Sequence, residues 1–440
     1  MRSHLLPLSV AVLFIHPVFA QTPEPSLNVK PVVVAPAAGA TLTLDEALAR
    51  ATDANPSLRA AAREVSAVEA TILQAKTRPN PELQGLVEDL RNETRVTTVQ
   101  INQPIELGGK RGARIAAAEK NRSAASLALD VQRADIRADV VTAFADVLAA
   151  QEGVRLAQAT AELAQRASGV AARRVLAGRV SPVEETRARV AEANVRMEAA
   201  TATYELAAAR KRLAGLWGAA SPDFAQVQGS LESLPPLPPL ADLNQQLETS
   251  PALLRARLEI ERRSALTQVE RSLRTPDVTV SLGARRNNEL GMNQAVIGAS
   301  LPLPLFNRNQ GNILEAERRT DKARDELAAA TVQASNTLAQ AHARLDLARQ
   351  SVTTLRDQIL PGAQSAYDAA TRGFELGKFN FLEVLDAQRT LFQSRAQHQR
   401  ALAEAYRAAA DIERVLGGAM ASAGPVDAHL STSGMKQESK

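Results

Sequence analysis

The chain of 440 residues contains no cysteine, which excludes disulfide bridges, thiolate metal sites and a lipid-modified N-terminal cysteine. Aromatic residues make up only 3% of the chain, and there is a single tryptophan. This composition argues against ordinary globular cores, whereas the alanine-rich segments suit long helices that pack closely side by side. After the N-terminus, no segment has the roughly 20 consecutive apolar residues of a membrane-spanning helix, so we expect no such helix.

The charges and motifs also exclude several function classes. The formal net charge is +4, from 52 Lys and Arg against 48 Asp and Glu. Arginine is dispersed among acidic residues, which is typical of solvated helix faces and not of a nucleic-acid-binding surface. The sequence has no Ser/His/Asp grouping, no metal-ligand cluster and no phosphate-binding loop. We therefore predict that the protein is not an enzyme and needs no cofactor.

The N-terminus has the pattern of a secretory signal. Arg2 precedes the apolar stretch 5–14, and Val18-Phe19-Ala20 offers a small-residue cleavage site. A membrane anchor is the weaker alternative, because the apolar run is short and is broken by proline. We expect residues 1–20 to be the signal.

The rest of the chain is duplicated. Asn55-Pro56 returns as Ser250-Pro251, Leu216 returns as Leu416, and the matching motifs keep their order at offsets of 195 to 200 residues. A repeat of this length is a duplicated half-molecule, because solenoid units are only 20–50 residues long. The expected layout is a proline-rich segment over 21–40, a first repeat over 41–220, an irregular connector over 221–243, a second repeat over 244–418 and a disordered tail over 419–440.

Each repeat is expected to contribute two amphipathic strands. Apolar and polar residues alternate with period two in four short segments, which is a strand pattern. An amphipathic sheet over a soluble core would show the same alternation. The segments are 82–88 and 97–103 in the first repeat, and 277–285 and 294–301 in the second, with an asparagine-rich loop over 286–293.

Long helices are predicted between the strands and two equivalent turns. The first repeat should hold helices over 44–76, 111–174 and from Ser181 to about Trp217. The long helix of the second repeat should run over 312–372, interrupted only at Pro361-Gly362, and its returning helix should end near Leu416. Apolar residues recur every seven positions in both long helices, which predicts left-handed coiled-coil packing. They are Val140, Val147, Val154 and Ala161 in the first, and Leu338, Leu345, Val352 and Ile359 in the second.

These parts predict an α+β membrane duct. If the apolar strand faces meet lipid, every backbone group must be paired, and only a closed barrel achieves that. Four strands cannot close a barrel, so several chains would have to pool their strands. The polar faces would then line a tube that continues into a sheath of helices. A periplasmic coiled-coil scaffold without a barrel is the rival interpretation.

Two kinds of motif give the chain a family resemblance over residues 41–418. The strand-to-helix corners Gln103–Arg111 and Pro302–Asn309 and the segment Glu383–Gln388 after the second turn resemble the TolC family of outer-membrane efflux ducts. The resemblance implies a homotrimer with a shared 12-stranded barrel in the outer membrane and a coiled-coil tunnel in the periplasm. The corners are most similar to the cobalt–zinc–cadmium resistance (CzcC-like) branch.

The branch also implies a function and partners. Its members work with a periplasmic adaptor (membrane fusion) protein and a proton-driven inner-membrane pump of the RND type. The expected role is therefore passive conduction of divalent heavy-metal cations to the exterior. A drug-efflux or type I secretion duct of the same fold is the alternative.

By resemblance, the two turns are the functional site. In the family they close the tunnel and dock the adaptor. The docking residues would be Gly178, Arg179, Val180 and Ser181 in the first turn, and Gly377, Lys378, Phe379 and Asn380 in the second.

The expected gate lies in the second turn only. Glu383 and Asp386 match the family's acidic gate positions, and a spacing of three puts both on one helix face. Three-fold symmetry would stack them into acidic rings, although they would also suit the dipole of the helix N-terminus. In the first repeat only Glu184 matches, because Arg187 occupies the second position.

The gate has an aromatic component and no metal site. Phe374 and Phe379 stand where some family members carry a Tyr–Arg latch, so an apolar constriction is the hypothesis here. No histidine has a second ligand at helical spacing, and we expect no protein-bound metal. The histidines are His4 and His16 in the signal, His342 and His398 on helices, and His429 in the tail.

Overall fold

The structure is a computed structural model that describes residues 41–376, 378–379 and 381–418. All of these belong to one compact unit, Ala37–Lys440. The expected signal, the proline-rich segment over 21–40 and the tail over 419–440 lie outside the described residues. Within the described ranges, no helix combines the length and the apolarity that crossing a membrane requires.

The helices of the first half begin and end where local caps allow. Thr43 accepts a hydrogen bond from the backbone N–H of Glu46, whose carboxylate accepts one from Thr43 in return, which forms a capping box. Asn55 caps the next helix through the N–H groups of Ser57 and Leu58, and Pro56 fits its first position. The helices are α1 (Leu44–Ala54), α2 (Pro56–Lys76), α3 (Lys110–Leu176) and α4 (Pro182–Gly215).

The second half departs from the predicted helix at one place. A π-helical turn at Leu355–Ile359 precedes Pro361, so the interruption begins before the proline. Proline has no N–H and crowds the preceding turn, and a wider turn accommodates both effects. The sequence did not predict α5, which starts inside the expected connector. The helices of this half are α5 (Leu240–Leu247), α6 (Pro251–Ser272), α7 (Gln310–Thr354), α8 (Leu360–Glu375) and α9 (Phe381–Leu416).

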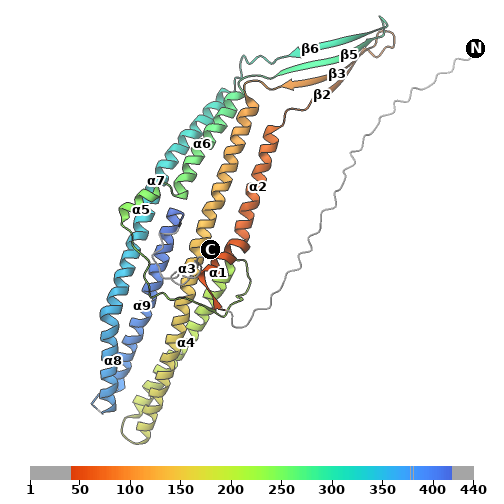
Figure 1. Cartoon of the computed structure of the whole chain (residues 1–440). Helices are drawn as coiled ribbons and strands as arrows, with labels where there is room; N and C mark the ends of the chain where they lie inside the picture. Colours follow the sequence, from red (N-terminus) through yellow and green to blue (C-terminus); the bar gives the residue numbers. More distant parts are fainter. Residues whose placement is uncertain (1–40, 377, 380, 419–440) are drawn as a thin grey trace, which may run out of the picture. The chain divides into compact units, whose positions relative to one another are not determined.

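The four predicted strands are present and form one antiparallel sheet in the order β2-β3-β5-β6. The central pair, β3 with β5, joins the two halves of the chain (Figure 1). The expected loop over 286–293 is shorter than predicted, because β5 continues to Asn287 and β6 starts at Met292. The strands are β2 (Glu82–Glu88), β3 (Val96–Ile105), β5 (Val278–Asn287) and β6 (Met292–Ser300).

A second, minimal sheet ties the connector to the start of the described chain. β1 (Thr41–Leu42) pairs in parallel with β4 (Gln226–Val227). The sequence predicted neither strand, because two-residue strands carry no periodicity. Leu42 and Val227 are buried in the apolar cluster of the first half.

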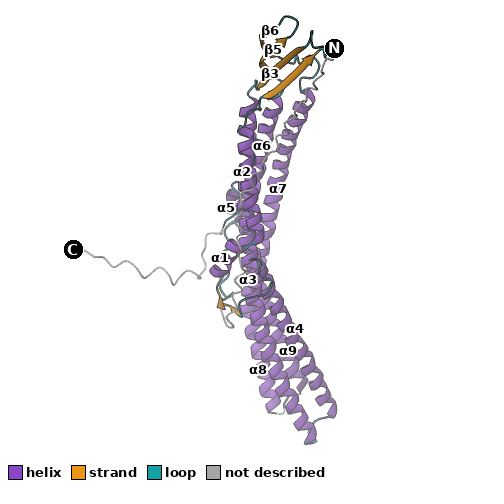
Figure 2. Cartoon of the chain, turned by 90° about the vertical axis from the view of Figure 1, so that its right-hand side faces the viewer, coloured by secondary structure: helices purple, strands orange, loops and turns teal. Residues whose placement is uncertain are grey.

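The helices pack in the order α4, α3, α9, α8, and their seams form the core. Figures 1 and 2 show α3 running from the sheet to the first turn and α7 and α8 continuing from the sheet to the second turn, while α4 and α9 return from the turns. Val140 and Val147 in α3 and Leu338 and Leu345 in α7 are fully buried, as the seven-residue pattern predicted. Ile359 does not follow this pattern and is 41% exposed, because the π-helical turn shifts the phase of the helix.

Two glycines make the corner between β3 and α3. Gly108 and Gly109 both have left-handed backbones, with φ of 69° and 72°. A Cβ on Gly108 would lie 2.6 Å from the Cβ of Thr275 and 3.0 Å from the carbonyl oxygen of Ser272, whereas one on Gly109 would meet nothing within 4 Å. Both positions therefore need glycine for the left-handed backbone, and Gly108 also needs it because a side chain would have no space.

We expect Gly109→Ala to lower the free energy of unfolding by about 1 kcal/mol, the cost of a left-handed alanine. Gly108→Ala should lower it by roughly 1–3 kcal/mol more, since the methyl group also displaces Thr275. Urea unfolding of the purified protein, followed by far-UV circular dichroism, measures both. Equal losses in the two variants would contradict the packing argument at Gly108.

Candidate functional site

The first turn is a glycine-capped helix end followed by a capped helix start. The N–H of Ala177 donates to the carbonyl of Arg173, and Gly178 takes a left-handed backbone with φ of 67°. Ser181 then accepts the N–H of Val183 at 3.3 Å and starts α4. Of the expected docking residues, Gly178, Arg179 and Ser181 are exposed and Val180 is half-buried.

The second turn closes through a different set of contacts. The N–H groups of Lys378 and Phe379 both donate to the carbonyl of Gly373, at 2.8 and 3.2 Å. A Cβ on Gly373 would lie 2.1 Å from Cδ2 of Phe379, so the ring lies directly against the glycine backbone. Phe379 is 45% exposed on its other side, and Lys378 is exposed. Gly377 and Asn380 lie outside the described residues.

Phe374 connects the two helical hairpins, the first formed by α3 and α4 and the second by α8 and α9. The guanidinium carbon of Arg174 in α3 lies 3.9 Å from the centroid of the Phe374 ring, and its Nη2 donates to the Phe374 carbonyl at 3.4 Å. The ring also packs against a small cluster around Ala171 and Ala188. Sequence reasoning missed Arg174, because the contact joins residues 200 positions apart and neither repeat contains the whole pair. Phe374 therefore faces the first hairpin of its own chain.

The acidic pair lies in the first two turns of α9. Glu383 and Asp386 are both exposed, and they lie three residues apart on the same helix. In α4, Glu184 is half-buried and Arg187 is exposed. The turns therefore differ in charge as the sequence predicted, and the gate assignment stays a prediction.

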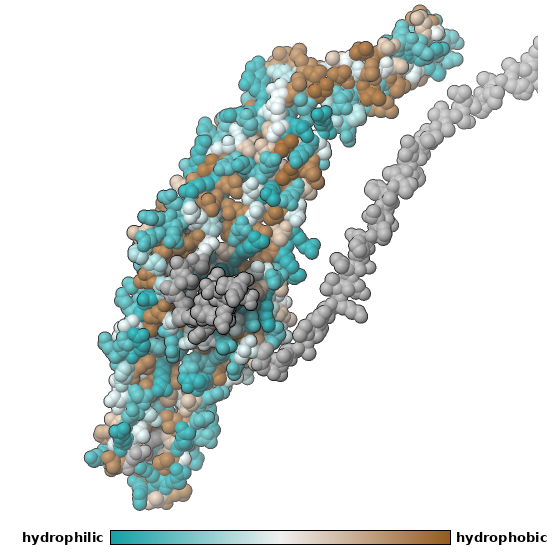
Figure 3. Space-filling model, in the orientation of Figure 1, coloured by the Kyte–Doolittle hydropathy of each residue, from teal (hydrophilic) through white to brown (hydrophobic). Residues whose placement is uncertain are grey.

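One face of the sheet is an exposed apolar row. The register places Leu83, Ile101, Leu282 and Ile297 next to one another across all four strands. Each of these side chains is more than half exposed. Figure 3 shows the apolar side chains gathered over the strands. An apolar face of this extent marks a surface that another apolar medium covers.

The opposite face carries a chain of hydrogen bonds between neutral side chains. The amide groups of Gln100 and Asn102 in β3 both donate to Oε1 of Gln84 in β2, each at 2.9 Å. Ser281 in β5 donates to Oδ1 of Asn102 at 2.7 Å. The two faces of the sheet therefore differ as the period-two alternation predicted.

Ion pairs fix the corner where β3 meets α3. Lys110 Nζ lies 2.7 Å from Oδ1 of Asp277, which also accepts the N–H of Leu107 at 3.1 Å. Arg114 pairs with Glu106. These contacts hold the first corner against the start of β5, so the residues that carry the family resemblance also position the sheet on the helices.

The helical histidines have structural surroundings. His342 Nε2 lies 3.1 Å from the carbonyl oxygen of Pro238 in the connector. Burial, with the positive charge of Arg356, lowers the pKa of His398 and favours its neutral form. Among the described residues, no three His, Cys, Asp or Glu side chains come together in a possible metal site.

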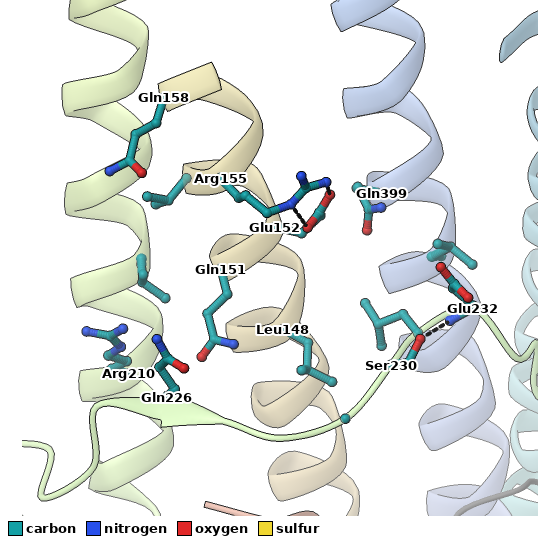
Figure 4. A pocket seen from close by; sticks show the side chains of 15 residues that line it. Leu148, Gln151, Glu152, Arg155, Gln158, Arg210, Gln226, Ser230, Glu232 and Gln399 are labelled. Carbon is teal, nitrogen blue, oxygen red and sulfur yellow. Dashed lines mark hydrogen bonds and ion pairs between the residues drawn. The ribbon is translucent and has the colours of Figure 1, made fainter. Parts of the chain in front are cut away.

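A polar pocket of about 630 Å³ lies between α3, α4, α9 and the connector (Figure 4). Gln151 donates to the carbonyl of Val227 at 3.1 Å and accepts its N–H at 2.8 Å, so this side chain clamps β4 onto α3. Glu152 pairs with Arg155 on the same helix. The pocket is thus a space beside a structural clamp, and its polar groups form no metal-ligand set.

Comparisons with known proteins identify relatives and a fold. The chain is 50% identical over 418 residues to the cobalt-zinc-cadmium resistance protein CzcC of Cupriavidus metallidurans, covering 95% of this chain and 100% of that protein. It is 30% identical over 286 residues to the nickel and cobalt resistance protein CnrC of the same organism, covering 64% of this chain and 68% of that protein.

The solved structures that are similar to this chain share its fold at low sequence identity. A membrane protein from Pseudomonas aeruginosa matches with a TM-score of 0.74 and 21% identity, over 86% of this chain and 90% of that one. CusC, whose structures describe transmembrane channel formation, matches with a TM-score of 0.72 and 21% identity, over 86% and 92%.

The family model described as "Outer membrane efflux protein" matches two ranges, residues 47–219 and 243–418. One range lies in each half of the chain, and together they cover well over half of it. The match confirms the resemblance that the corner and turn motifs predicted. The chain belongs to the outer membrane efflux protein family.

Proposed function

We propose that this protein is the outer-membrane channel through which a tripartite efflux system passes divalent heavy-metal cations from the periplasm to the exterior. The proposed substrate class rests on the 50% identity to a cobalt-zinc-cadmium resistance protein over that protein's whole length. The family is one of outer-membrane efflux proteins and not a class of enzymes. Conduction would be passive, and a proton-driven RND-type inner-membrane pump would supply the energy.

The sheet supports a shared barrel in the outer membrane. In the described chain β2 and β6 each pair with one neighbour, which leaves both outer edges of the sheet open. Unpaired backbone groups are not tolerated in lipid, so these edges must pair with other copies. Three copies would supply twelve strands, within the range of known barrels. The exposed row at Leu83 and Ile297 would then meet lipid, and the amide chain at Gln84 would line the lumen.

The two turns would dock a periplasmic adaptor protein. Gly178, Arg179 and Ser181 in the first turn and Lys378 and Phe379 in the second offer exposed surface at the end opposite the sheet (Figure 1). Two similar turns per chain would give a trimer six docking positions. We also place Val180, Gly377 and Asn380 in this docking surface, because of the family resemblance.

The gate would be the acidic pair of the second turn. Glu383 and Asp386 are exposed in each chain, and three-fold symmetry would bring six carboxylates around one axis. Rings of carboxylates attract cations and repel anions, as in other cation-selective pores. Phe374 and Phe379 would form the apolar part of the closure, with Phe374 held by Arg174.

The substrate class is tested by complementation. A strain that lacks its own duct, but expresses the cognate adaptor and pump, should regain resistance to zinc, cobalt and cadmium when this chain is supplied. Minimal inhibitory concentrations of the three metals and of a panel of drugs measure the effect. Restored drug resistance without metal resistance would instead make the protein a drug-efflux duct.

The acidic gate is tested by conductance. We expect Glu383→Gln/Asp386→Asn to lower the cation-over-anion permeability ratio of the purified channel in planar bilayers by roughly 3-fold to 10-fold, since the neutral amides keep the size and remove the charge. Glu184→Gln in the first turn is the matched control and should leave the ratio within about 2-fold. An unchanged ratio in the double variant rules out the acidic gate.

The aromatic part is tested separately. Phe379→Ala should raise the conductance of the closed channel several-fold by removing the ring over Gly373, without changing ion selectivity. Val180→Ala alters the equivalent position of the first turn and serves as the control. If both variants behave like the wild type in single-channel recordings, Phe379 is not part of the constriction.

A further inference from the structure

The apolar face of the sheet carries a single charged side chain. In β5 this face continues from Leu282 through Ala284 to Arg286, because successive side chains of a strand alternate between faces. The register places the neutral Thr97 and Asn293 beside Arg286 on the neighbouring strands. Among the strand residues of the described chain, Arg286 is the only charged residue on this face, and it is exposed. It therefore marks one boundary of the apolar surface.

Arg286 lies at the height where the apolar band of a membrane barrel ends. It follows Leu282 by four residues, which is about 13 Å along a strand. A strand tilt of roughly 40° reduces this to about 10 Å along the membrane normal. At the other end Val278 precedes Leu282 by four residues and is apolar, so the row at Leu282 lies near the middle of the band. Since such bands are about 25 Å tall, the guanidinium of Arg286 reaches the level of the lipid headgroups.

Arg95 supplies a second guanidinium next to Arg286. The N–H of Asn288 donates to the carbonyl of Arg95 at 3.0 Å, which extends the register of β3 and β5 by one pair. Arg95 is therefore diagonal to Arg286 on the same face, at about 7–8 Å. Both side chains belong to the end of the sheet that lies away from the helices (Figure 1).

Neither of these positive charges is neutralised within the described chain. The Nη1 of Arg286 donates to Oδ1 of Asn293 at 3.2 Å, and the Nη2 of Arg95 donates to a backbone carbonyl at 3.3 Å. Both acceptors are uncharged. The neighbouring carboxylate of Asp89 pairs with Arg91 instead. A guanidinium has five N–H donors, so most of those on Arg286 and Arg95 are left for a ligand.

We propose that Arg286 and Arg95 bind a phosphate group of lipid A, the phosphorylated glycolipid of the exterior leaflet of the outer membrane. The proposal rests on the barrel of the proposed function, in which the helices extend into the periplasm and the strand turns face the exterior. Guanidinium groups bind phosphate through paired, charge-assisted hydrogen bonds. The aliphatic stem of Arg286 lies along the apolar face while its charged end meets the phosphate. Each copy in the trimer supplies one such site.

The site is tested by titrating lipid A into the purified protein in detergent and counting bound lipid by native mass spectrometry. We expect Arg286→Gln to weaken the binding about 5-fold or more, because it removes charge-assisted hydrogen bonds to phosphate. Arg286→Lys keeps the charge but loses the paired geometry, so its affinity should fall between the two.

Arg285→Gln is the matched control. Arg285 is the adjacent residue of β5, but it belongs to the opposite face and pairs with Glu88 at 3.3 Å. Its replacement should leave the affinity for lipid A within about 2-fold of the wild type. Unchanged binding in Arg286→Gln, or an equal loss in Arg285→Gln, overturns the site.

Three further probes identify the source of the phosphate. Wild-type protein should bind lipid A that lacks its phosphates as weakly as Arg286→Gln binds intact lipid A, and this measurement needs no variant to fold. Neither phosphatidylglycerol nor inorganic phosphate should displace lipid A. Displacement by inorganic phosphate would make this a site for the free ion, and equal binding of phosphatidylglycerol would make it a general headgroup contact. Either result overturns the proposal, as does tight binding of lipid A without phosphates.

Parallel measurements of size and conductance separate two failures. A trimer that conducts in planar bilayers but binds lipid A independently of Arg286 overturns the phosphate site and leaves the duct intact. A wild-type protein that is monomeric in detergent and forms no channels overturns both.

Discussion

The requirement that every backbone N–H and C=O group of a strand be paired governs this structure. The four strands satisfy it among themselves through an in-register sheet, and the join between the halves is the central pair β3 and β5. The outer edges of β2 and β6 remain unpaired in the described part of the chain. Four strands cannot close a barrel within one chain, so in the proposed barrel the need to pair these edges would force several chains to associate. The helices that follow the strands would then be arranged with the same symmetry.

Local periodic patterns explain why so much of the fold could be predicted from the sequence. Alternation with period two gave all four strands, and a seven-residue period gave the buried Val140, Val147, Leu338 and Leu345. Both patterns are local, so they can be recognised in the sequence without knowing which other segment each one packs against. The π-helical turn before Pro361 was not predicted, because the helix has two ways to relieve a proline and local sequence does not choose between them.

The candidate site was less visible for the opposite reason. The turns were located by their caps and glycines, which are local features. The stacking of Arg174 on the Phe374 ring joins two side chains from distant parts of the chain, and the Phe379 ring folds back onto the backbone of Gly373. No sequence spacing encodes either contact. The two copies also differ at equivalent caps. The side chain of Asn55 makes four hydrogen bonds, to Ser57, Leu58 and Leu216, whereas the equivalent Ser250 is fully buried and its hydroxyl makes none.

The stacking of Arg174 on Phe374 indicates how strongly the two helical hairpins are held together at the end opposite the sheet. A cation–π contact of this kind contributes on the order of 0.5–2 kcal/mol, a few times the thermal energy. Three such contacts per trimer would hold neighbouring hairpins together without locking them. Their combined strength is comparable to what the docking of another protein can supply. The contact between the hairpins would thus be reversible: a docking partner could separate them, and they would pack together again when that partner leaves.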